Sequence, residues 1–216
     1  KWEHTGMPTE AALRTLCEKL GAPGVPEANE DAPERASDYW RRNHSLVATL
    51  EFERTRKSMS VITCRADAAP ASASLGGAAS LAALAGVPPS AFSVLVKGAP
   101  ESVLERCDRV LLAGGQTATL NARMREALNE AVAQMAGGAS ALRCLACAMR
   151  HGLSAHPSQL PLHDPLRFVE VETGLTFVGL VGLRDPPRPE VAQAIETCRL
   201  AGIRVVCITG DNAATA

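Results

Sequence analysis

The stretch TLEFERTRKSMSV, residues 49–61, changes the spacing of apolar residues in the chain to a period of two. Leu50, Phe52 and Arg54 fall on one face of a predicted strand, and Met59 and Val61 fall on one face of the next. The polar and charged residues between them predict a turn, so an antiparallel hairpin is the economical interpretation. This hairpin combines an aromatic ring with three cationic side chains, which raises the question of a ligand.

The segments on either side of the hairpin predict further regular elements. Before it, a helical spacing of apolar residues begins at Thr9, which we expect to cap the helix, and ends at Gly21. The other expected elements, in chain order, are a helix at 37–42, a strand at 92–96, helices at 100–107 and 123–135, and a strand at 142–149. The predicted class is α/β, with an antiparallel sheet and flanking helices in this part of the chain.

The carboxyl-terminal part has the most regular pattern. Near-continuous apolar runs at 175–183 and 203–208 enclose a helical spacing at 189–201. This order predicts a βαβ unit of a Rossmann-type domain, with its two strands paired in parallel. Ligands of open α/β sheets bind beyond the carboxyl ends of such strands. The residues that follow the two runs are Asp185, Thr209, Gly210 and Asp211.

Composition limits the kinds of partner. The chain has 216 residues and a formal net charge of -1, so any basic site must be local. The near-neutral charge and 3% aromatic content leave no extended basic stripe, which argues against nucleic-acid binding. The uncharged segment 68–96 is interrupted by Gly, Pro and Ser. We therefore expect no membrane-spanning helix and no membrane contact by these residues.

The cysteines favour a reducing compartment over a disulfide framework. There are seven of them, an odd number, without a regular spacing. Cys144 and Cys147 form a lone CxxC, and a zinc site would need a second pair of ligands. We interpret them as two cysteines of one strand and expect no metal site.

A nucleotide would use the side chains of the hairpin. Adenine needs an apolar slab, and phosphates need two or three cations. Phe52 could supply the slab, with Arg54 and Lys57 as cations, and Lys97 a second cationic wall beside Gly98, which leaves room for close approach. The alternative is a core Phe beside a solvated turn, with Lys97 and Arg143 as ordinary residues at strand ends.

Six motifs occur in the order typical of P-type cation-transporting ATPases. They are GMPTEAAL at 6–13, Phe52 and Arg54 with RKSMSV at 56–61, KGAPE at 97–101, LRCLA at 142–146, DPPR at 185–188 and TGDN at 209–212. KGAPE, DPPR and TGDN are highly specific, and together the motifs run from one end of the chain to the other. The combination of RKSMSV with LRCLA most resembles the sarco/endoplasmic-reticulum-type calcium pumps.

The resemblance implies a role for each matching residue. Phe52 would stack on adenine, Glu10 would hydrogen-bond near the base, Gly98 would let the backbone come close and Leu145 would add an apolar wall. The cations that would line the pocket and meet the phosphates are Arg54, Lys57, Lys97 and Arg143. In such pumps Asp185 lies at the hinge into the phosphorylation domain. The TGD of Thr209, Gly210 and Asp211 would help hold the transferred phosphoryl group and its magnesium.

The resemblance also implies a division into domains. Residues 1–173 would form a nucleotide-binding domain, incomplete at its amino-terminal side, and residues 174–216 would begin the second part of a haloacid-dehalogenase-like phosphorylation domain. Because early strands of the sheet would then be missing, we expect the isolated piece to be marginally stable in solution. The sequence contains no DKTGT, so it lacks the phosphorylated aspartate and should not turn over.

The full-length parent implied by the resemblance is an ion-translocating enzyme. It would hydrolyse ATP with Mg2+ through an aspartyl phosphate and drive Ca2+, bound outside these residues, across the endoplasmic or sarcoplasmic reticulum membrane. The partners would be ATP and the phosphorylation, actuator and transmembrane domains of the same pump, with this piece on the cytosolic face. The alternatives are a secretory-pathway calcium/manganese pump, a non-catalytic nucleotide-binding module, and a soluble phosphatase of the haloacid-dehalogenase superfamily with a large cap.

Overall fold

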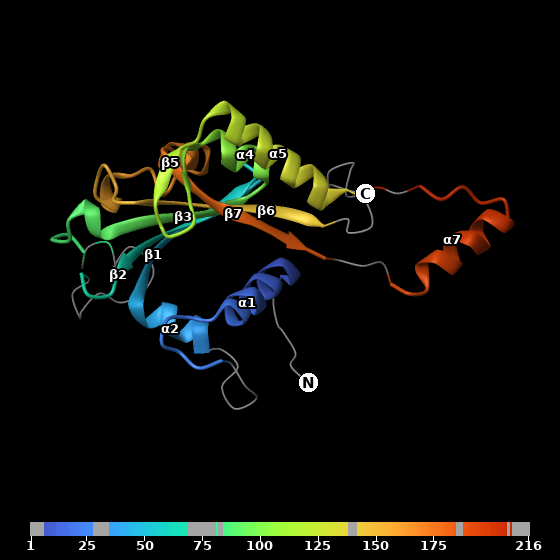
Figure 1. Ribbon diagram of the computed structural model, residues 1–216, viewed down its shortest axis with the longest axis horizontal. Helices are drawn as coiled ribbons and strands as arrows, with labels where there is room; N and C mark the ends of the chain where they lie inside the picture. Colours follow the sequence, from blue (N-terminus) through green and yellow to red (C-terminus); the bar gives the residue numbers. More distant parts are fainter. Residues whose placement is uncertain are drawn as a thin grey trace.

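The structure is a computed structural model with α/β architecture (Figure 1). It describes the following residues: 7–27, 35–68, 81, 84–137, 142–184, 188–206 and 208. Within these ranges, none of the helices has the length and apolar character needed to cross a bilayer.

A seven-stranded sheet forms the centre of the fold, with the strand order β1-β2-β3-β6-β7-β4-β5. Its strands are β1 (His44–Glu53), β2 (Ser58–Arg65), β3 (Phe92–Gly98), β4 (Cys107–Leu111), β5 (Thr117–Thr119), β6 (Arg143–His151) and β7 (Leu175–Leu183). Neighbouring strands pair antiparallel, except for β4 and β7, which pair in parallel. The predicted class, an α/β fold with an antiparallel sheet and flanking helices, is confirmed.

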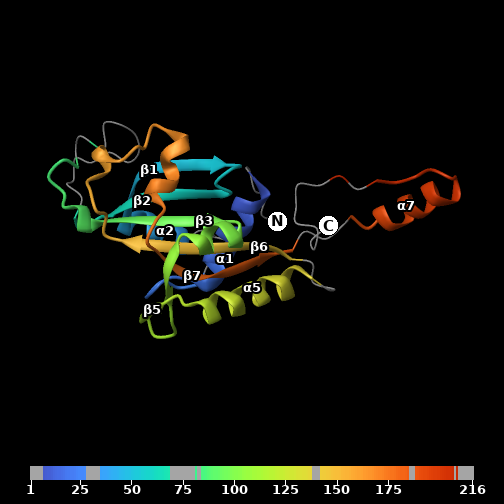
Figure 2. The same ribbon diagram turned by 90° about the horizontal axis from the view of Figure 1, so that it is seen from above.

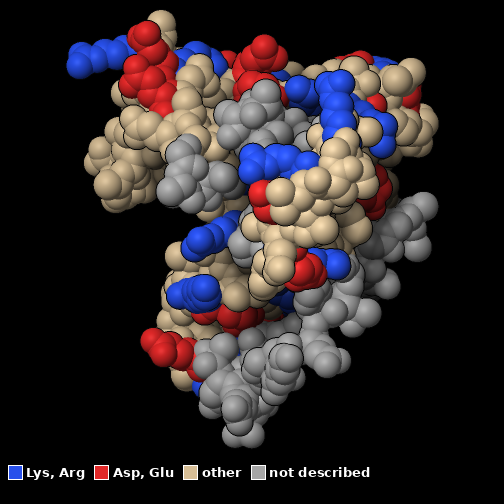
Figure 3. All heavy atoms as spheres, turned by 90° about the vertical axis from the view of Figure 1, so that its right-hand side faces the viewer, with Lys and Arg blue, Asp and Glu red and all other residues tan. Residues whose placement is uncertain are grey.

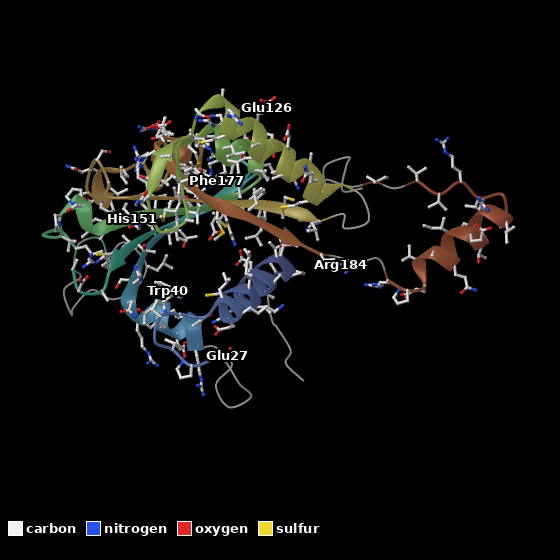
Figure 4. The ribbon with its side chains drawn as sticks, in the orientation of Figure 1. Glu27, Trp40, Glu126, His151, Phe177 and Arg184 are labelled. Atoms are coloured by element: carbon white, nitrogen blue, oxygen red, sulfur yellow. The ribbon has the colours of Figure 1, made fainter. Side chains whose placement is uncertain are left out.

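Helices flank the sheet on both faces. The helices among the described residues are α1 (Pro8–Leu20), α2 (Arg35–Asn43), α4 (Pro100–Glu105), α5 (Ala122–Ala136), α6 (Phe168–Val171) and α7 (Val191–Leu200), with short 3-10 turns η1 (Pro89–Ala91), η3 (Pro157–Gln159) and η4 (Pro165–Arg167). Figures 1 and 2 show α4 and α5 on one face and α1 and α2 on the other. In Figure 4, Glu126 on α5 and Trp40 on α2 mark these two faces.

The core lies between the sheet and α4. In β3 alternate residues are buried, from Phe92 to Gly98, and the same alternation begins β2. Ile62 and Val96 of the sheet belong to one buried cluster with Val103 of α4. Full burial of side chains of this size stabilises the fold by about 1.5–3 kcal/mol each. The period of two thus assigns one face of β2 and β3 to the core and leaves the other face more open.

The ends of α1 agree only in part with prediction. Gly21 ends the helix with φ 73, a left-handed conformation that costs Gly little. Thr9 is not the cap: Met7 holds the N-cap position, without a side-chain hydrogen bond, and Pro8 is the first helical residue. Proline suits that position because its fixed φ is helical and its missing N–H has no partner there to lose.

The carboxyl-terminal part differs from the predicted βαβ unit. β7 is a strand as expected, but it pairs with β6 and β4 inside the main sheet. The described residues of 203–208 have no strand assignment. In Figures 1 and 2, α7 lies beyond the end of the sheet, and none of its residues is buried. The prediction of parallel pairing between 175–183 and 203–208 was therefore wrong for the residues that the structure describes.

Candidate functional site

The more open face of the sheet carries a row of side chains that crosses three strands. Met59 of β2 lies opposite Lys97 of β3, and Lys97 lies opposite Cys147 of β6. All three are half-buried, and they alternate with the residues that point into the core. Because neighbouring strands lie about 4.8 Å apart, the row spans about 10 Å.

A β-bulge places Phe52 at one end of this row. Leu50 pairs with Ser60 and Glu53 pairs with Ser58, so Glu51 and Phe52 together lie opposite Met59. Leu50 is fully buried, whereas Phe52 is 60% exposed. The prediction that these two side chains share a strand face was therefore wrong, because the extra residue breaks the alternation. The exposed ring also contradicts the alternative that Phe52 is a core residue.

The turn after the bulge is held by Glu53. Its carboxylate accepts hydrogen bonds from the backbone N–H of Thr55 at 3.0 Å and of Arg56 at 2.9 Å, and from the Thr55 hydroxyl at 2.9 Å. These hydrogen bonds, the one from the Thr55 backbone first, lower the pKa of Glu53. Arg54 lies exposed in this turn and not in the strand where the alternation placed it.

Lys57 closes the turn in a conformation unusual for its residue type. Its φ is 52, and its backbone N–H donates to the carbonyl of Glu53 at 2.7 Å. Its ammonium lies 3.1 Å from the carboxylate of Glu101, in the first turn of α4. A lysine in the left-handed region persists where the surrounding contacts fix the backbone.

Gly98 lies against this turn. A Cβ at Gly98 would come within 2.5 Å of the Lys57 carbonyl oxygen and 2.7 Å of the Ser58 Cβ. The backbone N–H of Ala99 donates to the same Lys57 oxygen at 2.9 Å. The close approach predicted at Gly98 is thus an approach by the backbone of the hairpin itself.

Glu10 reaches the row from α1. Its carboxylate forms an ion pair with the ammonium of Lys97, whose side chain is 29% exposed. At the other end of α1, the carboxylate of Glu18 accepts hydrogen bonds from the backbone N–H groups of Ala36 and Ser37, both at 2.9 Å, which joins α1 to α2. These contacts hold α1 over the open face and place the carboxylate of Glu10 beside the ammonium of Lys97.

Arg143 and Leu145 lie on β6, on the side of Cys147, because alternate residues of a strand point to one face. Arg143 is exposed and Leu145 is half-buried. Arg143 is four residues from Cys147, which is about 13 Å at 3.3 Å per residue. Its place is therefore at the far end of β6 from the Lys97 row.

Asp185, Thr209, Gly210 and Asp211 lie outside the residues that the structure describes.

Sequence reasoning missed two members of the row. Met59 and Cys147 enter it only through strand register, although the offset between RKSMSV and KGAPE could have indicated the first. Burial raises the pKa of the Cys147 thiol, while Lys97 acts in the opposite direction. The Cys144 sulfur instead lies 3.9 Å from the carbonyl oxygen of Val132 in α5, so the two thiols point to opposite faces of β6.

The chemistry of the row suits a nucleotide better than a metal. It offers an exposed aromatic ring, a flexible thioether and a cation within about 10 Å, distances that fit a purine and its phosphates. No group of three His, Cys, Asp or Glu among the described residues could hold a metal ion. On the side of the molecule in Figure 3, Lys and Arg lie among Asp and Glu, so its cations act locally.

Comparison with known proteins gives the family. The family model described as P-type ATPase, cytoplasmic domain N, matches residues 1–190. The chain belongs to this family. The match includes every described element of the sheet and of the candidate site.

Known relatives of this N-domain chain carry calcium-pump names. It is 40% identical to "Calcium-transporting ATPase 2, endoplasmic reticulum-type" of Arabidopsis thaliana, an alignment that covers 98% of the chain. It is 41% identical over 98% of its length to "Calcium-transporting ATPase 4, endoplasmic reticulum-type" of the same plant. It is 40% identical over 99% of its length to a "Probable calcium-transporting ATPase" of Trypanosoma brucei brucei. The chain spans about a fifth of the length of these relatives, 19% to 20%.

Proposed function

We propose that this chain binds ATP on the open face of its sheet. The observation that carries the proposal is the convergence of Phe52, Lys97 and Glu10 on one row, from three elements far apart in sequence. The ring of Phe52 stacks on adenine, and Met59 lies between the ring and the cation. Lys97 binds the phosphates, which replace Glu10 as its ion-pair partner. The Glu10 carboxylate is then available to accept a hydrogen bond from a donor near the base.

Four further residues complete the proposed pocket. Lys57 and Arg54 extend the cationic wall along the turn, and Arg143 lies at the distal end of β6, where the polyphosphate leads away from the base. Leu145 adds apolar surface between Arg143 and Lys97. Mg2+ would arrive with the nucleotide, since the Glu10 carboxylate at the row is paired with Lys97, and one carboxylate among a cation and apolar side chains does not suit a divalent metal.

The proposed parent is a calcium-transporting P-type ATPase of the endoplasmic reticulum membrane. The names of the plant relatives support both the ion and the membrane. In such a parent, ATP held by this domain would phosphorylate an aspartate elsewhere in the chain, and Ca2+ would bind outside these residues. The partners of this domain would be the phosphorylation, actuator and transmembrane parts of the same protein.

The domain division at residue 173 stays a prediction. The order of strands in the sheet favours a later boundary, which we propose instead. β7 lies between β6 and β4, so its loss would divide the sheet. We therefore place the end of the nucleotide-binding domain after Leu183, with the phosphorylation domain beginning beyond it.

Titration of the chain with magnesium-free ATP tests the proposal. Calorimetry should show saturable binding that Phe52→Ala weakens by about five-fold or more, because stacking on an aromatic side chain is worth about 1–3 kcal/mol per base. Leu166→Ala is the matched control, since Leu166 is also an exposed apolar residue, at 86%, but lies in η4. Unchanged affinity in Phe52→Ala, or no binding by a folded sample, would contradict the proposed site.

A further inference from the structure

A buried charge cluster lies beneath the hairpin turn. The carboxylate of Glu172, with a side chain 0% exposed, forms ion pairs with Arg56, whose side chain is 4% exposed, and with Arg106, at 10%. The hydroxyl of Ser58 also donates to Glu172, at 2.9 Å. The Arg56 guanidinium lies 5.2 Å from the centroid of the Phe168 ring. The cluster thus joins the turn to α6 and to the end of α4.

The two guanidinium groups also bind the backbone of the turn. Arg56 donates to the carbonyl oxygens of Glu51 and, at 3.3 Å, of Leu50. These two carbonyls immediately precede Phe52 in the bulge. Arg106 donates to the carbonyl oxygen of Arg56 at 3.1 Å. Glu172 therefore reaches the backbone that presents Phe52 through one intervening side chain.

The charge balance makes a purely stabilising role a poor explanation. One carboxylate faces two guanidinium groups, so the cluster buries an excess of positive charge. Burial lowers the pKa of Arg56, and the Glu172 carboxylate opposes this effect. Buried ion pairs often contribute no more than apolar residues of similar volume, and their better-supported role is to select one conformation. The conformation that this cluster contacts is the bulge and the turn that follows it.

We infer that Glu172 is a positioning residue for the nucleotide, acting through Arg56 on the bulge that exposes Phe52. The inference rests on the proposed ATP site. Glu172 fixes the Arg56 fork, the fork fixes the two carbonyls before Phe52, and the ring stays on the open face beside Met59. Arg106 holds the turn from the other side, where Lys57 adopts its left-handed conformation.

A double-mutant cycle separates positioning from stability. Glu172→Gln keeps the shape of the side chain and removes its charge, and we expect ATP affinity to fall about ten-fold. In the Phe52→Ala background the same change should alter affinity less than about two-fold, because the positioned ring is already gone. Glu170→Gln is the matched control, since it removes an exposed carboxylate of α6, at 51% side-chain exposure, two positions before Glu172.

Arg56→Lys provides a second variant should Glu172→Gln fail to fold. A lysine keeps the positive charge beside Glu172, but its single ammonium cannot span the carboxylate and both carbonyls. We expect the same coupling to Phe52, together with shifted amide resonances for Phe52 and Lys57 in the ligand-free chain. Each variant is compared with the unsubstituted chain at a temperature where thermal melts show both to be folded.

The outcomes distinguish the inference from the function on which it rests. Equal losses of affinity in the two backgrounds, or no loss from either variant, would overturn the positioning role and leave the cluster a structural one. If the unsubstituted 216-residue chain binds no ATP, the proposed function is overturned. The amide resonances then decide positioning alone: if Glu172→Gln moves those of Phe52 and Lys57 no more than Glu170→Gln does, the inference is wrong.

Discussion

Gly98 is the residue at which the sheet and the turn come closest. A methyl group there would lie 2.5 Å from the Lys57 carbonyl oxygen, which is a backbone atom that cannot rotate away. We expect Gly98→Ala to lower the free energy of unfolding by about 1–3 kcal/mol, the usual cost of overpacking. Urea denaturation measures this loss. Gly179→Ala in β7 is the control, since a Cβ there meets no atom within 4 Å, and it should cost much less.

At the level of single residues, the sequence indicates which side chains belong to a site better than it indicates how exposed those side chains are. Phe52 and Lys97 were predicted members of one site, and the structure places them at opposite sides of Met59. The exposure of Phe52 depends on a bulge. It could not be predicted from the sequence, because the alternation of faces assumes a regular strand. Glu172 was missed altogether, because its partners Arg56 and Arg106 are distant in sequence.

The hairpin turn should respond to acid through Glu53. Hydrogen bonds from Thr55 and Arg56 lower the pKa of this carboxyl from its ordinary 4.5 in the folded chain. The ionised group therefore contributes stability above pH 4.5, and this contribution is lost as the pH falls through the lower, folded-state pKa.

We accordingly expect the difference in unfolding free energy between the parent and Glu53→Gln to shrink as the pH falls below 4.5. Chemical denaturation from pH 6 to pH 3 measures it. Glu51→Gln, two positions earlier, serves as control because its carboxylate does not cap the turn. A difference that stays constant over this range would mean that the charge of Glu53 does not hold the turn.

Among the elements, those with a clear apolar period were predicted and those without one were not. The strands β2, β3, β6 and β7 and the helices α1, α2, α4 and α5 all lie where the spacing indicated. The hairpin of β4 and β5 was missed, because Asp108 and Arg109 interrupt the first strand and the second has only three residues. Pairing partners are set by tertiary packing, so the parallel contact of β4 with β7 was not foreseen.

At the scale of the whole molecule, the site depends on parts of the chain that are widely separated. The row needs β1, β2, β3 and β6 in register and α1 above them, while the turn rests on Glu172 next to α6. β7 pairs with β6 along its length, from Arg143 opposite Leu183 to Met149 opposite Thr176. The strand that carries Arg143 and Leu145 therefore relies on β7 for its outer hydrogen bonds.

Shortening the chain at two places tests where the domain ends. A chain that ends at residue 184 keeps all seven strands and loses α7, which has no buried residue. It should melt cooperatively and bind ATP with the same affinity as the 216-residue chain. A chain that ends at residue 173 loses β7 and with it the buried Leu175 and Phe177, at 0% and 3% exposure.

Loss of β7 separates β4 and β5 from the rest of the sheet and leaves the edge of β6 unpaired, which favours aggregation. We expect the chain ending at 173 to show no cooperative melt and no saturable ATP binding. Thermal melting by circular dichroism, size-exclusion chromatography and calorimetry compare the two directly. A monomeric, cooperatively melting chain that ends at 173 and binds ATP would place the boundary before β7, because the nucleotide site would then be complete without that strand.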